Sequence, residues 1–213
     1  VHTAALTLNP EWPAIQDSLA PGHDIVIIAD VSFSRAGEAL TVQAATIARL
    51  IELMDGADRV QIIACATRCE PVGAHTWTRP DKTFAAKIHD NLSKIPASGT
   101  TNLLEGPRVA AALFDSRDDK SKARGARIIM LTDGEASSGV QAPAEVRAAL
   151  TKVLSPLGDA RLTPVDLGGG GDALMLRAMA LGGSGKLITL DPSEALGTAS
   201  RRILSAQGDR LMT

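Results

Sequence analysis

The sequence is poor in aromatic residues, has only two cysteines and contains no long apolar run. Its 213 residues include two tryptophans, three phenylalanines and no tyrosine, which disfavours a surface that stacks nucleobases or sugar rings. The 22 lysines and arginines against 24 aspartates and glutamates give a net charge of −2, so a nucleic acid is not favoured as a partner. No apolar run approaches the roughly 18 residues that a membrane-spanning helix requires.

The two cysteines, Cys65 and Cys69, lie four residues apart. Two thiols are too few for a disulfide scaffold, and we expect a buried Cys65 at a strand end and a separate Cys69 in a loop. A redox switch or a local disulfide is the alternative. Few cysteines and no recognisable signal peptide lean slightly toward the cytoplasm, although the chain starts at Val1 and a preceding signal or anchor stays open.

Apolar runs alternate with amphipathic stretches along the chain, which predicts an α/β fold. Continuous apolar runs at 25–29, 60–65 and 128–131 are typical of parallel strands covered on both faces. Amphipathic spacing predicts helices over 36–54, 83–92, 103–114, 143–157, 173–181 and 193–205, and shorter strands are expected at 71–78, 162–167 and 186–190. We expect a mostly parallel, doubly wound sheet with right-handed crossovers and helices on both faces.

The length fits a single domain with a full core. Residues 1–20 contain two prolines and are predicted to form an N-terminal arm or extra strand, and residues 21–213 the main domain. The charged segment 116–125 is predicted to be a solvated loop.

Three short polar segments stand next to these predicted elements. Asp30, Ser32 and Ser34 follow the first apolar run, Thr101 precedes a predicted helix, and Asp133 follows the run at 128–131. Ligands of open α/β sheets bind at the carboxyl ends of the strands, where both carboxylates are expected. The five side chains are all hard oxygen donors, which suits Mg²⁺ or Mn²⁺. The segments contain no imidazole or thiolate, so zinc and copper are poor candidates.

Each segment taken alone has a simpler interpretation. Serines and threonines after strands often stabilise turns or cap helices, and Asp133-Gly134 is a common turn dipeptide. All three segments in order favour a cation site. Thr100 is an alternative ligand to Thr101, and Asn102 is expected to cap the following helix.

The same residues resemble the metal-ion-dependent adhesion site of von Willebrand factor A domains, which combines Asp-x-Ser-x-Ser, a later threonine and a later aspartate. The resemblance continues at 58–63 and 174–190 and covers roughly residues 20–206. It implies a Rossmann-like three-layer fold and direct ligation by Ser32, Ser34 and Thr101, with Asp30 and Asp133 acting directly or through water. It also implies Mg²⁺ or Mn²⁺, with Ca²⁺ less favoured, and a partner protein whose Asp or Glu carboxylate completes the coordination.

Two residues depart from the family pattern, which often has Gly between the serines and Met after them. Phe33 and Arg35 stand in those places. Phe33 either packs on the domain or presents an apolar contact beside the ion. Arg35 is expected to be exposed at a helix start; the alternatives are that its charge weakens cation affinity or attracts an acidic partner.

The function expected from these observations is protein binding without catalysis, in a chain whose alanine content suggests a bacterial source. The four histidines show no metal-ligand spacing, and no Gly-x-Ser-x-Gly element is present. The glycines at 168–171 precede a helix but lack the Walker pattern. A metal-dependent phosphohydrolase and a structural subunit of a ring-ATPase-associated assembly are the alternatives.

Overall fold

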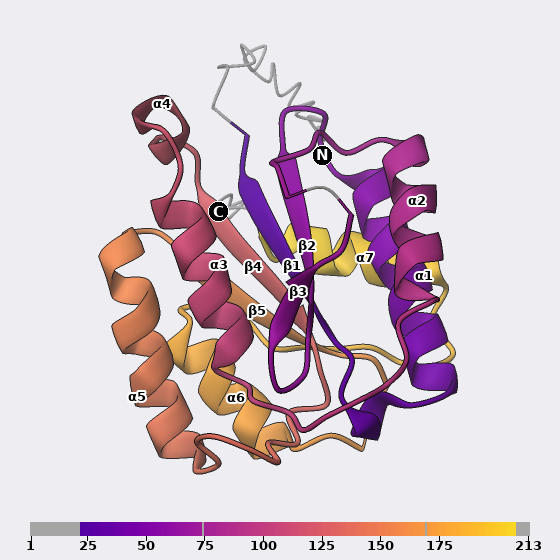
Figure 1. Ribbon diagram of the computed structural model, residues 1–213, viewed down its shortest axis with the longest axis vertical. Helices are drawn as coiled ribbons and strands as arrows, with labels where there is room; N and C mark the ends of the chain where they lie inside the picture. Colours follow the sequence, from indigo (N-terminus) through magenta and orange to yellow (C-terminus); the bar gives the residue numbers. More distant parts are fainter. Residues whose placement is uncertain (1–21, 74, 169, 208–213) are drawn as a thin grey trace, which may run out of the picture.

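A computed structural model describes residues 22–73, 75–168 and 170–207, which fold around one six-stranded sheet (Figure 1). The strand order is β3-β2-β1-β4-β5-β6. All neighbouring strands are parallel except the antiparallel pair of β2 and β3. The strands are β1 (Asp24–Asp30), β2 (Arg59–Cys65), β3 (Cys69–Pro71), β4 (Ala126–Leu131), β5 (Arg161–Asp166) and β6 (Ile188–Thr189).

Helices cover both faces of the sheet, which confirms the predicted three-layer α/β fold. One face carries α1 (Glu38–Leu53), α2 (Lys82–Leu92) and α7 (Leu196–Ser205), and the other carries α3 (Glu105–Asp115), α5 (Pro143–Leu154) and α6 (Ala173–Gly182). Every residue of β1 is buried, and alternate residues enter the two cores: Ile25 and Ile27 one, Val26 and Ile28 the other. This two-sided burial explains the unbroken apolar run.

The predicted helices are present, with ends shifted by a few residues, but two predictions fail. The strand expected at 71–78 ends at Pro71, and beyond it only the isolated bridge between Val60 and Thr78 continues the pairing. The segment 116–125 is only partly the predicted solvated loop. It contains the short helix α4 (Asp119–Lys122), and Arg117 and Arg124 turn inward, with side chains only 6% and 16% exposed.

The two cysteines are bonded to each other. Cys65 ends β2, Cys69 begins β3, and the antiparallel register places them opposite one another. Their sulfurs form a disulfide, so the expectation of two separate thiols is wrong and the alternative of a local disulfide holds. The predicted N-terminal arm at 1–20 lies outside the described residues. Within the described part of the chain, no helix is long and apolar enough to span a membrane.

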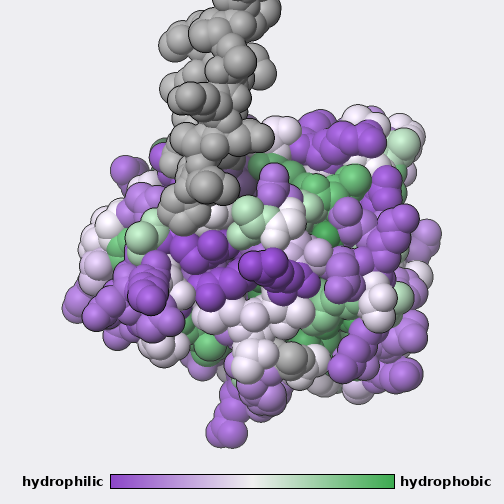
Figure 2. Space-filling model, turned by 90° about the horizontal axis from the view of Figure 1, so that it is seen from above, coloured by the Kyte–Doolittle hydropathy of each residue, from purple (hydrophilic) through white to green (hydrophobic). Residues whose placement is uncertain are grey.

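Asp24 is the centre of a charge network at the edge where β1 and β4 begin. Its side chain is fully buried and accepts hydrogen bonds from three guanidiniums. Arg59 donates through Nε and Nη2, both at 2.8 Å, Arg117 through Nη1 at 2.9 Å and Arg124 through Nε at 2.7 Å. Figure 2 views this edge from above and shows hydrophilic side chains over much of it. The network ties β1 to β2 and to the segment after α3.

This network predicts how the free energy of unfolding responds to acid. Burial would raise the pKa of Asp24, but the hydrogen bonds from the three guanidiniums outweigh it and hold the pKa below its ordinary value. A carboxyl with a lowered folded pKa contributes stability above its unfolded pKa and loses it as pH falls through the folded pKa. We therefore expect the contribution of Asp24 to be complete at neutral pH and to decrease progressively as the pH falls below roughly 4.

Urea unfolding over a pH series measures this loss. The Asp24→Asn variant has no carboxyl at this position and should show a shallower decrease in the free energy of unfolding on acidification. Equal decreases in the free energy of unfolding of the wild type and Asp24→Asn would contradict the assignment of the acid-sensitive contribution to the Asp24 carboxyl.

Candidate metal centre

The candidate ligands lie at the edge of the sheet where the central strands end. Asp30 is the last residue of β1, and Asp133 lies two residues beyond β4. The chain adds β2 on one side of β1 and β4 on the other, so the strand order reverses between β1 and β4. This reversal opens a crevice at the carboxyl ends of the strands, which is where open α/β sheets bind ligands.

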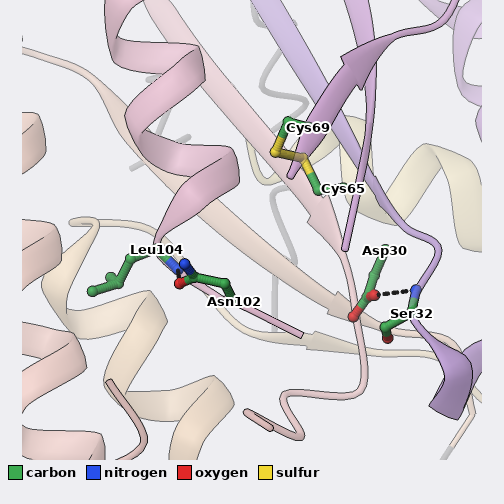
Figure 3. Close-up of a disulfide and its surroundings, with 6 residues drawn as sticks. All are labelled: Asp30, Ser32, Cys65, Cys69, Asn102 and Leu104. Carbon is green, nitrogen blue, oxygen red and sulfur yellow. Dashed lines mark hydrogen bonds between the residues drawn. A yellow bond between two sulfur atoms is a disulfide. The ribbon is translucent and has the colours of Figure 1, made fainter. Parts of the chain in front are cut away.

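Hydrogen bonds organise the first candidate segment. Asp30 is 1% exposed; its Oδ1 accepts from the Ser32 backbone N–H at 3.0 Å, as Figure 3 shows, and its Oδ2 from the Thr132 hydroxyl at 2.7 Å. The Ser32 and Ser34 hydroxyl oxygens lie 3.1 Å apart. The structure thus places the carboxylate of Asp30 beside a pair of neighbouring serine hydroxyls.

The loop after β5 sets the position of Asp133. The Asp133 carbonyl accepts a hydrogen bond from the Asp172 N–H at 2.8 Å, and its Oδ1 accepts from the Glu135 N–H at 3.0 Å. A Cβ at Gly171 would lie 2.3 Å from the Asp133 carbonyl oxygen. Only glycine allows this close approach, so Gly171, in the glycine run at 168–171, lets the loop pack against the backbone of Asp133.

The two carboxylates place negative charge at this edge of the sheet. Burial raises the pKa of Asp30 above its ordinary value; hydrogen bonds from Ser32 and Thr132 oppose the increase, and the charge of nearby Asp133 adds to it. Among the described residues, neither aspartate forms an ion pair. Two like charges at a partly dehydrated edge favour a bound cation electrostatically.

Thr101 lies on the loop between α2 and α3 and is 4% exposed. Its backbone N–H donates to the Ser137 hydroxyl at 2.8 Å, and its carbonyl accepts from the N–H groups of Ser137 and Ser138, both at 3.1 Å. The same loop reaches the first segment, because Phe33 N–H donates to the Gly99 carbonyl at 3.3 Å. The candidate segments therefore lie next to one another.

The structure separates the roles of the two adjacent threonines. The Thr100 hydroxyl is exposed and already hydrogen-bonded. It lies 3.1 Å from the Thr67 hydroxyl and donates to the Ser138 hydroxyl at 2.9 Å. Across the described residues, the Thr101 hydroxyl makes no hydrogen bond. This arrangement favours Thr101 as the ligand. Asn102 accepts from the Leu104 N–H at 3.3 Å (Figure 3), which stabilises the turn before α3. The N-cap residue of α3 is Leu104, so the expectation that Asn102 caps this helix is wrong.

The donor set fits a hard divalent cation. Asp30, Ser32 and Ser34 are joined by contacts, and Asp133 faces Asp30 within electrostatic reach. Thr101 is held by backbone hydrogen bonds to Ser137 and Ser138, and within the described residues its hydroxyl forms no hydrogen bond with the other four candidate ligands. No cluster of three or more His, Cys, Asp or Glu side chains occurs in the described ranges, so binding would depend on hydroxyl oxygens as well as carboxylates. Such a set suits Mg²⁺ or Mn²⁺.

Three supporting residues were missed from the sequence. Thr132 orients Asp30, Ser137 holds Thr101, and Gln43 of α1 donates through Nε2 to the Asp30 carbonyl at 2.9 Å. Thr132 could have been noticed because it stands directly before Asp133. Ser137 and Gln43 carry no local signal, since each acts across the tertiary structure.

Arg35 is buried, so its expected exposure at a helix start is wrong. It is 8% exposed, and its Nε has no hydrogen-bond partner. It lines a depression of about 470 Å³ together with Ser34 and Asp133. Phe33, in contrast, is 68% exposed. Of its two predicted placements, this exposure agrees with an outward-facing apolar side chain and not with packing on the domain. A cationic and an apolar side chain thus adjoin the candidate site.

The sequence model of the von Willebrand factor type A domain matches residues 25–135, more than half of the chain. The chain belongs to this family. The matched range includes all five candidate ligands, Asp30, Ser32, Ser34, Thr101 and Asp133. None of the curated proteins matches the chain significantly.

Solved von Willebrand factor type A structures share the fold at low sequence identity. An aerotolerance-related membrane protein from Bacteroides fragilis, in a form with multiple mutations to serines, has a TM-score of 0.66 and 20% identity over 87% of this chain and 98% of its own. A von Willebrand factor type A protein from Catenulispora acidiphila has a TM-score of 0.69 and 19% identity over 87% of this chain and 42% of its own.

A third similar structure carries a metal in its adhesion motif. Proximal thread matrix protein 1 from the mussel byssus, with a zinc-occupied motif, has a TM-score of 0.62 and 13% identity over 86% of this chain and 47% of its own. At this identity the similarity establishes the fold alone, and the zinc belongs to that protein.

Proposed function

We propose that this domain is a non-catalytic protein-binding module that holds a divalent cation through Asp30, Ser32, Ser34, Thr101 and Asp133 and recruits an acidic side chain of a partner protein. The observation that carries the proposal is that Asp30, which accepts a hydrogen bond from the Ser32 backbone N–H, lies beside the neighbouring Ser32 and Ser34 hydroxyls and close enough to Asp133 to sense its charge, at the point where the strand order reverses. The charge of the two aspartates, which form no ion pair among the described residues, supports a cation there.

The proposed ion is Mg²⁺ or Mn²⁺, because every candidate donor is oxygen. Ca²⁺ is less favoured, since it prefers six to eight oxygen ligands. The zinc-occupied motif of the mussel protein supports divalent-cation binding at this type of site and makes Zn²⁺ a necessary comparison.

The proposed partner presents an Asp or Glu carboxylate. When bound, the cation supplies a coordination position that an incoming carboxylate can fill. Arg35 lines the adjoining depression, and its guanidinium offers a charge-assisted hydrogen bond to the same carboxylate or to a neighbouring one. Glu38 and Glu135 also line the depression and are exposed, so they repel extended acidic segments. A single acidic residue beside an apolar side chain that contacts Phe33 fits this surface best.

Water-proton relaxation of the Mn²⁺-loaded domain tests the proposal with acetate as the carboxylate probe. We expect bound Mn²⁺ to enhance relaxation through its exchangeable water, and acetate to reduce the enhancement in a saturable way as it displaces that water. Mn²⁺ binding that acetate leaves unaltered would contradict carboxylate recruitment. Turnover of p-nitrophenyl phosphate with Mg²⁺ would contradict the non-catalytic role.

Replacing Arg35 tests its contribution to carboxylate binding. We expect Arg35→Met to weaken acetate binding to the Mn²⁺-loaded domain by about tenfold, because a hydrogen bond to a charged group contributes roughly 1.5–3 kcal/mol, while Mn²⁺ affinity is retained or increased. The matched control is Arg108→Met, at an exposed arginine of α3. Equal acetate affinity in both variants would remove Arg35 from the binding surface.

A further inference from the structure

The disulfide closes a short turn next to the candidate ligand loops. Cys65 and Cys69 bracket the turn residues Ala66, Thr67 and Arg68, and Ala66 N–H donates to the Arg68 carbonyl at 2.9 Å. Cys65 is 4% exposed, whereas Cys69 is only partly buried. Figure 3 shows the disulfide above Asp30 and Ser32 and beside the segment that enters α3. The crosslink therefore restrains a turn that adjoins the metal site.

This turn holds the residues on both sides of Thr101. Thr100 N–H donates to the Thr67 hydroxyl at 3.1 Å, and Asn102 N–H donates to the Ala66 carbonyl at 3.3 Å. A Cβ at Gly99 would lie 2.7 Å from the Thr67 hydroxyl oxygen, so the loop packs tightly against the turn. The backbone of Thr101 is thereby positioned by two residues enclosed within the disulfide.

The turn also contacts the first ligand segment. The Cys65 carbonyl accepts a hydrogen bond from Val31 N–H at 2.8 Å, and Val31 lies between Asp30 and Ser32. Asp30 and Cys65 are paired residues of the parallel strands β1 and β2. One crosslinked turn thus spans the distance between the Thr101 loop and the Asp30 segment.

We propose that the Cys65–Cys69 disulfide is a positioning element for Thr101, so that the cation affinity of the domain depends on the thiol–disulfide state of this pair. The inference rests on the cation site proposed above. Loss of a group that orients a metal ligand without binding the metal itself commonly weakens metal affinity by 10–100-fold. Opening the disulfide frees the turn, and the Thr101 hydroxyl must then be ordered when the cation binds.

A dithiol reductant can open the Cys65–Cys69 disulfide by thiol–disulfide exchange. Its thiolate attacks the more accessible Cys69 sulfur, the Cys65–Cys69 bond breaks, and a mixed disulfide forms as Cys65 leaves as a thiolate and takes up a proton. The second thiol of the reductant then displaces Cys69 as a thiolate, which is also protonated. The pair gains two electrons and two protons, and the reductant leaves as its own disulfide.

Mn²⁺ titration of the intact chain before and after reduction with dithiothreitol tests the proposal, with thiol counting to establish the redox state and circular dichroism to establish the fold. We expect the dissociation constant for Mn²⁺ to rise about tenfold on reduction and to return on reoxidation. In a Thr101→Ala variant, reduction should change the affinity no further, because the disulfide acts through that side chain.

A second variant leaves the disulfide intact. Thr67→Val removes the hydroxyl that binds the Thr101 loop and should weaken Mn²⁺ binding in the oxidised protein, whereas Thr189→Val, at an exposed threonine of β6, should not. Equal Mn²⁺ affinity of the oxidised and reduced protein would overturn this inference and leave the proposed function standing. A persistent redox effect in Thr101→Ala would also overturn it. Absence of Mn²⁺ binding in every form would overturn the proposed function itself.

Discussion

Asp30→Ala should abolish the stabilisation of this domain by divalent cations. A cation that binds only the folded state adds about 2.7 kcal/mol to the free energy of unfolding when its concentration is 100 times its dissociation constant. This increase raises the melting midpoint by about 5–10 °C in a domain of this size. Asp30 contributes one of the two carboxylates at the proposed site, and the serine pair is organised around it. Thermal melts in EDTA and in Mg²⁺, Mn²⁺, Ca²⁺ or Zn²⁺ measure the effect.

The quantity to compare is the cation-induced shift rather than the absolute midpoint. Removing the Asp30 carboxylate leaves the Ser32 N–H and the Thr132 hydroxyl without their acceptor, so the metal-free variant also changes in stability. Asp115→Ala, at an exposed aspartate of α3, is the matched control and should keep the full shift. A normal shift in Asp30→Ala would exclude the proposed ligand set, and no shift in the wild type would exclude the cation.

Asp24→Ala should give the largest loss of stability in the absence of metal, about 3–5 kcal/mol, because removing one partner of a buried ion pair leaves uncompensated charge. Three guanidiniums converge on this one fully buried carboxylate. Two of them, Arg117 and Arg124, have no other carboxylate within ion-pair distance in the described chain. Urea unfolding at pH 7 measures the loss.

A control and an independent readout separate this effect from the metal site. Asp119→Ala removes an exposed carboxylate of α4 that pairs, among the residues the structure describes, only with Lys122, and it should leave the unfolding midpoint unchanged. Asp24 begins β1 and Asp30 ends it, so Asp24→Ala should keep its cation-induced shift wherever it remains folded. A loss of less than about 1 kcal/mol would show that the network contributes little net stability.

The layered fold could be predicted because its signals are local. Central strands buried on both faces require continuous apolar runs, and the covering helices require an apolar stripe; both patterns are complete within short stretches. The strand ends are equally local, so Asp30 and Asp133 could be placed at one edge. The edge itself follows from the rule that parallel strands end together.

The failed predictions for the arginines share a physical cause, which is that each depends on groups remote in sequence. Arg117 and Arg124 were assigned to solvent, but they bind Asp24 from 93 and 100 residues away. Arg35 is buried in a depression that residues as distant as Gly171 complete. A charged side chain carries no sequence signal that distinguishes a solvated position from a paired or enclosed one.

The sequence alone determined the order of the elements, the burial of the central strands and the oxygen-donor chemistry of the candidate site, since these depend on residue type and short-range spacing. The tertiary structure decided which groups meet. The pairing of Cys65 with Cys69 follows from the β2–β3 register, and the support of Thr101 comes from Ser137 and the disulfide-bonded turn. These contacts exist only when separate segments pack together, so only the folded chain shows how the ligand loops are held.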